Sequence, residues 1–203
     1  MIGIINYGMG NLGSVQNSLN HLGKESEIFD QPEAIGQFDK LILPGVGAFG
    51  QAMDNLNKSG FSDAIRAQVA KGTPLIGICL GMQLMLEGSD EHGQHKGLGL
   101  LKGQVRNLEE KITDHPIPHM GWNTLLPQKE SILLKGFPEE DLVYYFVHGF
   151  YCDAADRSAV AATVSYGFEF DAVYEKGHLF ATQFHPEKSQ RSGLHILEQF
   201  ANL

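Results

Sequence analysis

The sequence predicts an α/β fold with a mixed, mostly parallel sheet, helices on both faces and an antiparallel extension. Over residues 1–90, short apolar runs alternate with segments of helical spacing, which is typical of parallel βαβ units. Beyond residue 100, several β-rich runs follow one another instead, separated by Gly, Asp and Pro. Because no repeat, low-complexity tract or linker interrupts the chain, residues 1–203 are expected to form a single domain.

The first half of the chain supplies the parallel strands and their helices. Strands are expected at 2–6, 25–29, 40–43 and 74–79, each an apolar run or strand-like segment bounded by turn signals. Apolar residues at helical spacing predict one helix from Leu12 to Leu22, which stops at Gly23, and another from Phe61 to Val69. A further helix is expected over 82–87, directly after the fourth strand.

The second half is expected to add antiparallel strands to the same sheet. The β-rich runs lie at 141–147, 159–164, 172–175 and 179–184. A final helix follows, with Leu194, Leu197, Phe200 and Ala201 on one side.

Composition and charge exclude several classes of protein. Hydrophobic residues make up 42% of the chain and charged residues 19%, as in an ordinary globular protein. The net charge is −9, without a Lys/Arg cluster, which argues against nucleic acid or an anionic membrane as partner. The N-terminus lacks the basic residues of a signal peptide, and no stretch approaches the roughly 20 apolar residues of a membrane span. We therefore expect a soluble, cytoplasmic protein.

Cys79 lies in the most informative local motif, Gly77-Ile78-Cys79-Leu80-Gly81, between a buried strand and a helix. This is the G-x-nucleophile-x-G arrangement, in which a sharp turn presents the side chain and small residues on either side avoid a clash. The helix N-terminus would favour a thiolate and offers backbone N–H groups to an oxyanion. A buried cysteine in a glycine-rich strand end is the alternative interpretation, and the placement of both glycines favours the nucleophile.

A thiolate nucleophile needs a base, and His185-Pro186-Glu187 supplies a candidate just after the strand at 179–184. Residues two apart in an extended segment point the same way, and proline keeps the segment extended. Glu187 could therefore orient the imidazole while His185 faces Cys79. A surface turn is the alternative, but parallel α/β sheets keep their sites at such strand ends.

Two other features imitate binding sites. Gly8 to Gly13 forms a GxGxxG pattern after a strand, with Asp30 some twenty residues on, so a nucleotide-binding module remains an alternative function. Histidines 92, 95, 115 and 119 could suggest a metal site, but prolines and glycines surround them and no ligand set is complete. These histidines are therefore expected in loops, and no metal or cofactor is expected.

The two cysteines are too few for a disulfide framework or a Cys-based zinc site, and Cys152 is expected to have no role.

The motifs GICLGMQ (77–83) and QFHPEKS (183–189) closely resemble those of class I (triad) glutamine amidotransferases. Within that class, PGVGAFG (44–50), PHMGWN (118–123) and YFVHGF (145–150) resemble the glutaminase subunit of imidazole glycerol phosphate synthases. The resemblance extends from NYGMGN near the N-terminus to the final helix, so it implies this family's fold for essentially the whole chain.

The resemblance implies a role for each matching residue. Cys79 would attack the glutamine carboxamide, His185 would protonate the departing ammonia, and Glu187 would hold His185. Further roles implied are an oxyanion hole at Leu80 and Val46–Gly47, glutamine binding by Gly45, Gly47, Gln83, His148, Gly149 and Phe150, and a partner interface at Asn11, Trp122 and Lys188.

The partner implied is a (β/α)₈-barrel synthase subunit in a heterodimer, which would use the ammonia to make imidazole glycerol phosphate and an aminoimidazole carboxamide ribotide. In this family the PGVG strand is thought to reorient when the partner binds substrate, and the glycines beside Val46 make such a peptide flip cheap.

One departure concerns residues 148–150, where the family usually has His-Ser-Tyr or His-Thr-Tyr and this chain has His148-Gly149-Phe150. Backbone contacts to glutamine would survive, but a hydroxyl contact would be lost. An alternative is therefore a similar glutaminase that supplies ammonia to a sugar amidotransferase in bacterial surface-polysaccharide synthesis.

Two further alternatives are less consistent with the sequence. A peptidase or deglycase with the same cysteine turn would not need Gln83 or the PGVG segment. A catalytically dead subunit would not need all three triad residues, which are present here.

Overall fold

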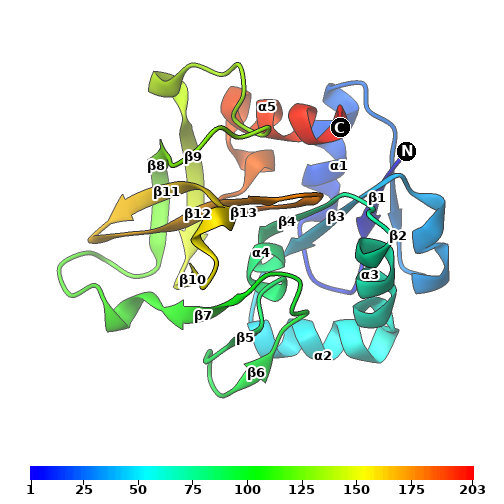
Figure 1. The fold of residues 1–203 in the computed structure, drawn as a ribbon, viewed down its shortest axis with the longest axis horizontal. Coiled ribbons are helices and arrows are strands. Elements are labelled where there is room, and N and C mark those ends of the chain that lie inside the picture. The colour runs from blue at the N-terminus through cyan, green and yellow to red at the C-terminus, as the bar shows by residue number, and fades with distance from the viewer.

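A mixed sheet of thirteen strands runs through the protein, and helices cover both of its faces (Figure 1). The computed structural model describes residues 1–203. The strands are β1 (Ile2–Ile5), β2 (Ser26–Phe29), β3 (Lys40–Gly45), β4 (Leu75–Cys79), β5 (Gly88–Ser89), β6 (His95–Lys96), β7 (Gly103–Asn107), β8 (His119–Pro127), β9 (Val143–His148), β10 (Phe150–Ala154), β11 (Val160–Tyr166), β12 (Phe168–Lys176) and β13 (Leu179–Thr182). The α-helices are α1 (Leu12–His21), α2 (Phe49–Ser59), α3 (Phe61–Ala70), α4 (Leu80–Leu84) and α5 (Gln190–Ala201).

The strand order confirms the predicted architecture. The parallel part runs β2-β1-β3-β4-β13, with β4 between β3 and β13. Antiparallel pairing begins where β13 meets β12, and beyond β12 the sheet divides toward β10 and β7 on one path and toward β11, β8 and β9 on the other. The last of the parallel strands is therefore also the strand that joins the two parts.

Successive side chains of the parallel strands point to opposite faces of the sheet, and each face has its own hydrophobic core. Ile4 and Ile42 pack on the side of α1 and α5, whereas their neighbours Ile5 and Leu43 pack on the side of α2, α3 and α4. Successive strand residues point to opposite faces, so strands that are buried on both sides read as continuous apolar runs. This explains why the strands at the N-terminus and before Cys79 are so apolar.

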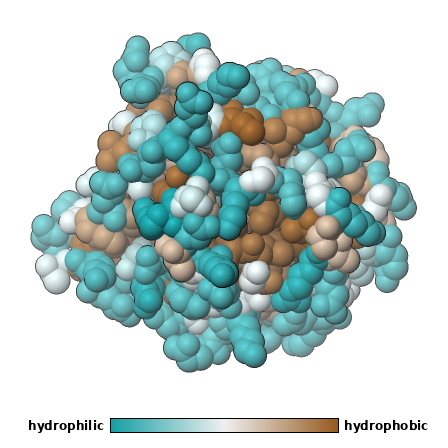
Figure 2. All heavy atoms as spheres, in the orientation of Figure 1, coloured by the Kyte–Doolittle hydropathy of each residue, from teal (hydrophilic) through white to brown (hydrophobic).

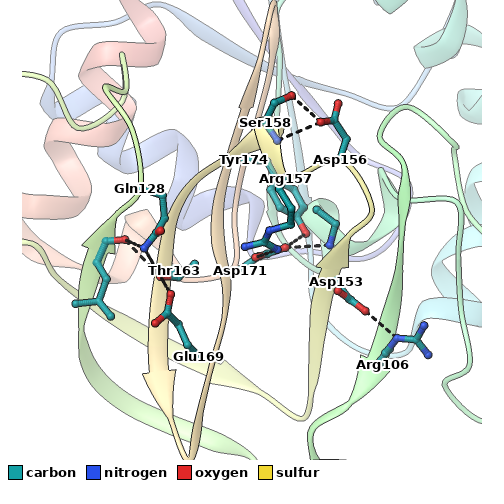
Figure 3. Close-up of polar contacts among 12 residues, drawn as sticks. Arg106, Gln128, Asp153, Asp156, Arg157, Ser158, Thr163, Glu169, Asp171 and Tyr174 are labelled. Carbon is teal, nitrogen blue, oxygen red and sulfur yellow. Dashed lines mark hydrogen bonds and ion pairs between the residues drawn. The ribbon is translucent and has the colours of Figure 1, made fainter.

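A buried carboxylate joins the elements of the antiparallel part (Figure 3). Asp171 on β12 is 2% exposed and accepts hydrogen bonds from the Ala154 backbone N–H at 2.9 Å and from the Tyr174 hydroxyl at 2.8 Å. The Arg157 guanidinium also donates to it, at 2.6 Å. Since a buried charge is costly unless it is paired, these three donors together tie β10 and the segment before β11 to β12.

The structure also corrects some of the expected elements. Helix α2 was not predicted, although its buried Phe49, Ala52, Met53 and Leu56 have helical spacing. The helix after Cys79 begins at Leu80 and ends at Leu84, earlier than the predicted 82–87. Strands β5, β6, β7, β8 and β10 were missed as well, and two of them, β5 and β6, have only two residues each.

Hydrophilic side chains cover most of the face drawn in Figure 2, and the hydrophobic ones show mainly toward its middle. None of the helices combines the length and the apolar character that crossing a membrane requires.

Candidate active site

Strand register gathers the predicted site residues at one edge of the sheet. In the β3–β4 pair, Gly45 lies opposite Cys79, and in the β13–β4 pair, Thr182 lies opposite Ile78. Strand β13 ends at Thr182, one register position before Cys79, and His185 follows three residues later at the same edge of the sheet. The carboxyl ends of neighbouring parallel strands form the crevice in which such folds keep their sites.

Cys79 occupies a strained turn between β4 and α4. Its backbone has φ 55° and ψ −109°, outside the regions that side chains with a Cβ normally adopt. A Cβ on Gly77 would lie 2.6 Å from the Gly81 carbonyl oxygen, and one on Gly81 would lie 1.8 Å from the Leu43 carbonyl oxygen. The two glycines that flank the motif are therefore required for the helix to start directly beside β3.

His185 and Glu187 form a buried pair that the sequence spacing anticipated. His185 Nδ1 lies 2.7 Å from Glu187 Oε1, and both side chains are 2% exposed. Because a carboxylate accepts, Nδ1 is the donor, and Nε2 is the ring nitrogen left without a hydrogen bond inside the protein. Burial opposes a charge on the ring, but the Cys79 thiolate and the Glu187 carboxylate outweigh it and raise the pKa of His185 to about 10.

The backbone around His185 is held by a second set of contacts. Its N–H donates to the Tyr145 carbonyl at 3.0 Å, and its carbonyl accepts from the Ser189 hydroxyl at 2.6 Å. The same hydroxyl accepts from the Tyr145 N–H at 2.9 Å. Strand β9 therefore fixes the short helical turn η5 (Pro186–Lys188) that carries the pair.

A cavity of about 460 Å³ opens beside Cys79 and His185. Its size is that of a small-molecule site. Its lining residues are Val46, Gly47, Cys79, Leu80, Gln83, Glu91, Pro118, Val147, His148, Gly149, Phe150, His185 and Lys188.

Most of the predicted binding residues lie in this lining, but three groups do not. Gly45 is buried behind it, where a Cβ would lie 2.7 Å from the Tyr7 hydroxyl. Glu187 is not part of the lining, and its hydrogen bond to His185 links it to the cavity. The predicted partner residues Asn11 and Trp122 lie outside the lining, whereas Lys188 belongs to it.

Trp122 and Lys188 are brought together by one aromatic ring. The Trp122 side chain is 49% exposed on β8, and its ring centroid lies 6.0 Å from that of Tyr145. The Lys188 ammonium lies 5.9 Å from the same Tyr145 ring. Strands β8 and β9 therefore connect an exposed tryptophan with the mouth of the cavity.

Two residues of the site were not found from the sequence. Glu91 is the cavity's one acidic lining residue, 9% exposed, and its Oε2 accepts from the Phe49 N–H at 2.7 Å. Gln183 is fully buried and its amide Nε2 lies 3.9 Å from Cys79 Sγ. Glu91 lies in a segment with no periodicity, so only the structure places it. Gln183 is the first residue of the QFHPEKS motif, and that position was the available signal.

The expectation of loop histidines was wrong for two of the four. His119 begins β8 and is 2% exposed, stacked on Phe146 and Tyr166, and His95 lies in β6. The structure holds no group of three or more His, Cys, Asp or Glu side chains arranged for a metal ion. Cys152 is buried, and its thiol lies 3.9 Å from Gln183 Oε1.

The glycines of the GxGxxG pattern form the turn between β1 and α1. Gly8 and Gly10 have φ values of 88° and 138°, in the region that favours glycine. A Cβ on Gly10 would lie 3.3 Å from the Pro44 ring, so this turn packs against the end of β3.

Comparison with known proteins agrees with this geometry. The family model "Glutamine amidotransferase class-I" matches residues 3–202. The imidazole glycerol phosphate synthase subunit HisH of Chlorobium luteolum is 45% identical over 202 residues, which cover 99% of each chain. The HisH subunit of Bacillus subtilis is 46% identical over 206 residues, covering 100% of this chain and 96% of the relative.

Solved structures share the fold at lower sequence identity. A glutamine amidotransferase crystal structure superposes with a TM-score of 0.74 at 20% identity, covering 100% of this chain and 99% of the other. The structure of PurLQS from Thermotoga maritima gives a TM-score of 0.75, also at 20% identity, with 99% and 97% covered. Taken with the full-length relatives, these matches show that the chain belongs to the class-I glutamine amidotransferase family and, within it, to the imidazole glycerol phosphate synthase subunits HisH.

Proposed function

We propose that Cys79, His185 and Glu187 are the catalytic triad with which this glutaminase subunit hydrolyses L-glutamine to glutamate and ammonia. The observation that carries the proposal is the buried His185–Glu187 pair at 2.7 Å, beside a cysteine in a strained turn that opens on a cavity. With its raised pKa, His185 holds a proton at neutral pH, which is the form that can serve as an acid.

The reaction follows from these positions. The Cys79 thiolate attacks the carboxamide carbon, and His185 gives its Nε2 proton to the departing nitrogen, so that ammonia leaves and a thioester forms. Neutral His185 then takes a proton from water, the resulting hydroxide attacks the thioester carbon, and the thiolate leaves as glutamic acid is released. Glu187 holds the ring in the orientation that this exchange needs throughout.

Backbone donors would stabilise the negative oxygen that forms during each attack. Leu80 is the first residue of α4, so its N–H has no partner within the helix. The Val46–Gly47 peptide follows the end of the neighbouring strand β3 and lines the same cavity. Together they would form the oxyanion hole, which commonly supplies a large share of catalysis in acyl transfer.

The remaining lining residues would hold the amino-acid part of glutamine. The ammonium group of the substrate needs an acidic partner, and Glu91 is the one carboxylate in the lining. Gln83 donates both of its amide hydrogens within the protein, to the Phe150 carbonyl and to Gln183, which leaves its Oε1 to accept from the ligand. Backbone groups at His148, Gly149 and Phe150 complete the wall, and Gly45 acts from behind the lining by supporting this end of β3.

The chain is a subunit of a complex in histidine biosynthesis, and its partner would be a (β/α)₈-barrel synthase that receives the ammonia. Trp122, Lys188 and Asn11 would contribute to the heterodimer interface, since the first two connect an exposed apolar side chain with the cavity mouth. Enclosing the transfer matters because ammonia in water is largely protonated at neutral pH and then is no nucleophile. The cytoplasm is the expected compartment for this complex.

Supply of a sugar amidotransferase is the less favoured destination for the ammonia. The full-length relatives at 45% and 46% identity are histidine-pathway subunits. The Gly149-Phe150 departure removes a hydroxyl from the cavity wall but leaves every triad residue in place.

The proposal is tested by measuring glutamate release from glutamine, for the chain alone and with a histidine-pathway barrel loaded with its nucleotide substrate. We expect low release alone, a strong increase with the loaded barrel, and none in Cys79→Ala. Cys152→Ala is the matched control, and it should retain turnover. Turnover that survives Cys79→Ala would overturn the mechanism, and a folded, reactive chain that the barrel fails to stimulate would move the partner to another pathway.

A further inference from the structure

Gln183 connects both cysteines of the chain with the substrate-binding Gln83. The residue is fully buried between β13 and His185. Its Nε2 lies 3.9 Å from Cys79 Sγ, within the range of a hydrogen bond to sulfur. Its Oε1 accepts from Gln83 Nε2 at 3.3 Å and lies 3.9 Å from the Cys152 thiol.

The Phe150 carbonyl fixes the orientation of the Gln83 amide, and through it that of the Gln183 amide. The Phe150 carbonyl oxygen can only accept, and it lies 3.2 Å from the Gln83 side-chain amide, so the amide turns its NH₂ group toward it. The second hydrogen of that NH₂ group then points to Gln183, which must present its oxygen. Gln183 consequently has its NH₂ group facing Cys79, because the two ends of one amide cannot exchange without breaking both contacts.

A buried thiolate gains from every donor that faces it. His185 supplies one positive group, and the cavity side of the sulfur must stay open to substrate. Gln183 approaches from the interior, where a hydrogen bond to an ionised group is worth more than one between neutral groups. A neutral amide also has no proton to transfer, so it does not compete with His185 as an acid.

We propose that Gln183 is a second hydrogen-bond donor to the Cys79 sulfur, held in the donating orientation by Gln83 and the Phe150 carbonyl. The proposal rests on Cys79 being the nucleophile. Gln183 would stabilise the thiolate before attack and again when the sulfur leaves the thioester. It would act on the rate of reaction and on the ionisation of Cys79, and only weakly on the affinity for glutamine, because it does not line the cavity and the Phe150 carbonyl alone still orients the Gln83 amide.

The test uses the full chain with Cys152→Ala, so that Cys79 is the one remaining thiol. Alkylation by iodoacetamide is followed against pH in this parent and in Gln183→Met, which keeps a similar length and removes the donor. We expect the pH of half-maximal alkylation to rise and the rate at pH 7 to fall about tenfold or more. In the barrel-stimulated reaction, kcat should fall by a similar factor while KM for glutamine changes little.

Gln128→Met is the control, because Gln128 also donates within the protein, at 2.9 Å to Thr163, but is exposed and does not line the cavity. Its alkylation profile should equal the parent's. An unchanged profile in Gln183→Met, with folding verified by circular dichroism, would overturn the proposal.

A second variant decides the question if Gln183→Met does not fold. Gln183→Glu keeps an oxygen that accepts from Gln83 and replaces the donor by a carboxylate, which should move half-maximal alkylation to still higher pH by repelling the thiolate. A midpoint equal to or below the parent's would also overturn the proposal. If Cys79 of the parent reacts no faster than a free cysteine and its replacement leaves glutamine turnover intact, the proposed triad fails, whatever Gln183 does.

Discussion

His119 and His148 are buried and share a hydrogen bond of 2.9 Å, between Nδ1 of the first ring and Nε2 of the second. His148 Nδ1 lies 2.7 Å from the Phe150 carbonyl, which can only accept, so this nitrogen donates and Nε2 of a neutral ring accepts. His119 Nδ1 must then donate, and its Nε2 accepts from Asn123 at 3.3 Å. The pair therefore requires both histidines to be neutral.

Acid should destabilise the protein through this pair. Burial lowers the pKa of His119 to about 4, and burial lowers that of His148 to about 3 although the Phe150 carbonyl favours its charged form. In the unfolded chain both rings titrate near 6.5. Below that pH the unfolded state binds more protons, so stability is present above pH 6.5 and is lost as the pH falls toward 4 and then 3.

As the pH falls, the free energy of unfolding should decrease by at most about 1.4 kcal/mol per pH unit for each histidine. Urea unfolding at pH 7.0, 6.5, 5.5 and 4.5 measures it. Between pH 6.5 and 4.5 the contribution of His185 stays nearly constant, because its raised pKa of about 10 gives stability that is present below pH 6.5 and is lost as the pH rises from 6.5 toward 10. A free energy of unfolding that stays constant from pH 6.5 to 4.5 would contradict the burial of two neutral rings.

Removing one ring of the pair should be costly even at neutral pH. His119→Phe leaves the buried Nε2 of His148 without a donor, and an unsatisfied buried group costs about 1–3 kcal/mol. His115→Phe is the matched control, since His115 also packs against Tyr166, at 4.9 Å between ring centroids, but bonds only to exposed Asp114. Urea unfolding of both variants makes the comparison, and equal stability of the two would show that the hydrogen bond contributes nothing.

The parallel strands and the placement of Cys79, His185 and Glu187 were predictable for different physical reasons. The parallel strands are buried on both faces, so they read as apolar runs, and Cys79 is marked by two glycines that the turn cannot do without. His185 and Glu187 are two residues apart in the chain, so their spacing in the sequence already predicts that the two side chains can meet. Local patterns reveal such features because the physical constraint itself is local.

The residues that were missed depend on contacts across the chain. Glu91 enters the site because it accepts from the N–H of Phe49, 42 positions away, and no pattern around it signals this. His119 looks like a loop residue beside Pro118, and only its pairing with β9 and the rings of Phe146 and Tyr166 buries it. In strand β8 the apolar Met120 and Trp122 are exposed while His119 is buried, so hydrophobicity in the sequence does not mark the buried face of this strand.

Loss of the charge on Glu91 should weaken glutamine binding selectively. Glu91→Gln keeps an oxygen that can accept from the Phe49 N–H, but it removes the negative charge that would face the substrate ammonium. We expect KM for glutamine to rise about tenfold or more with little change in kcat, because the ammonium is equally charged in the ground state and the transition state. Steady-state kinetics with the loaded barrel measure both constants.

Glu87→Gln provides the comparison for Glu91→Gln. Glu87 also accepts from a backbone N–H, that of Gly103 at 2.9 Å, but it does not line the cavity. Its substitution should leave KM unchanged. Equal effects of the two substitutions, or a fall in kcat alone for Glu91→Gln, would argue against a direct contact with the ammonium.

Glu187→Gln should lower kcat while leaving glutamine binding nearly intact. The substitution keeps the size of the side chain but removes the carboxylate that accepts from His185 Nδ1 and holds its charge. Loss of oriented acid–base catalysis costs about 10²- to 10⁴-fold in rate. Single-turnover measurements of thioester formation would detect it, and a variant with the parent's rate would remove Glu187 from the triad.

Gly149→Ser should restore a hydroxyl that this chain lacks in its cavity wall. Gly149 has no left-handed backbone angle, and the nearest atom to an added Cβ is Ile117 Cγ2 at 4.0 Å, so a serine fits without strain. A neutral hydrogen bond to bound glutamine would lower KM about two- to tenfold with kcat unchanged. Gly13→Ser, with equally open surroundings on α1, should not change KM. If KM stays constant in Gly149→Ser as well, the backbone at 148–150 already makes all the contacts that glutamine uses on this wall, and the departure from the family pattern has no consequence for binding.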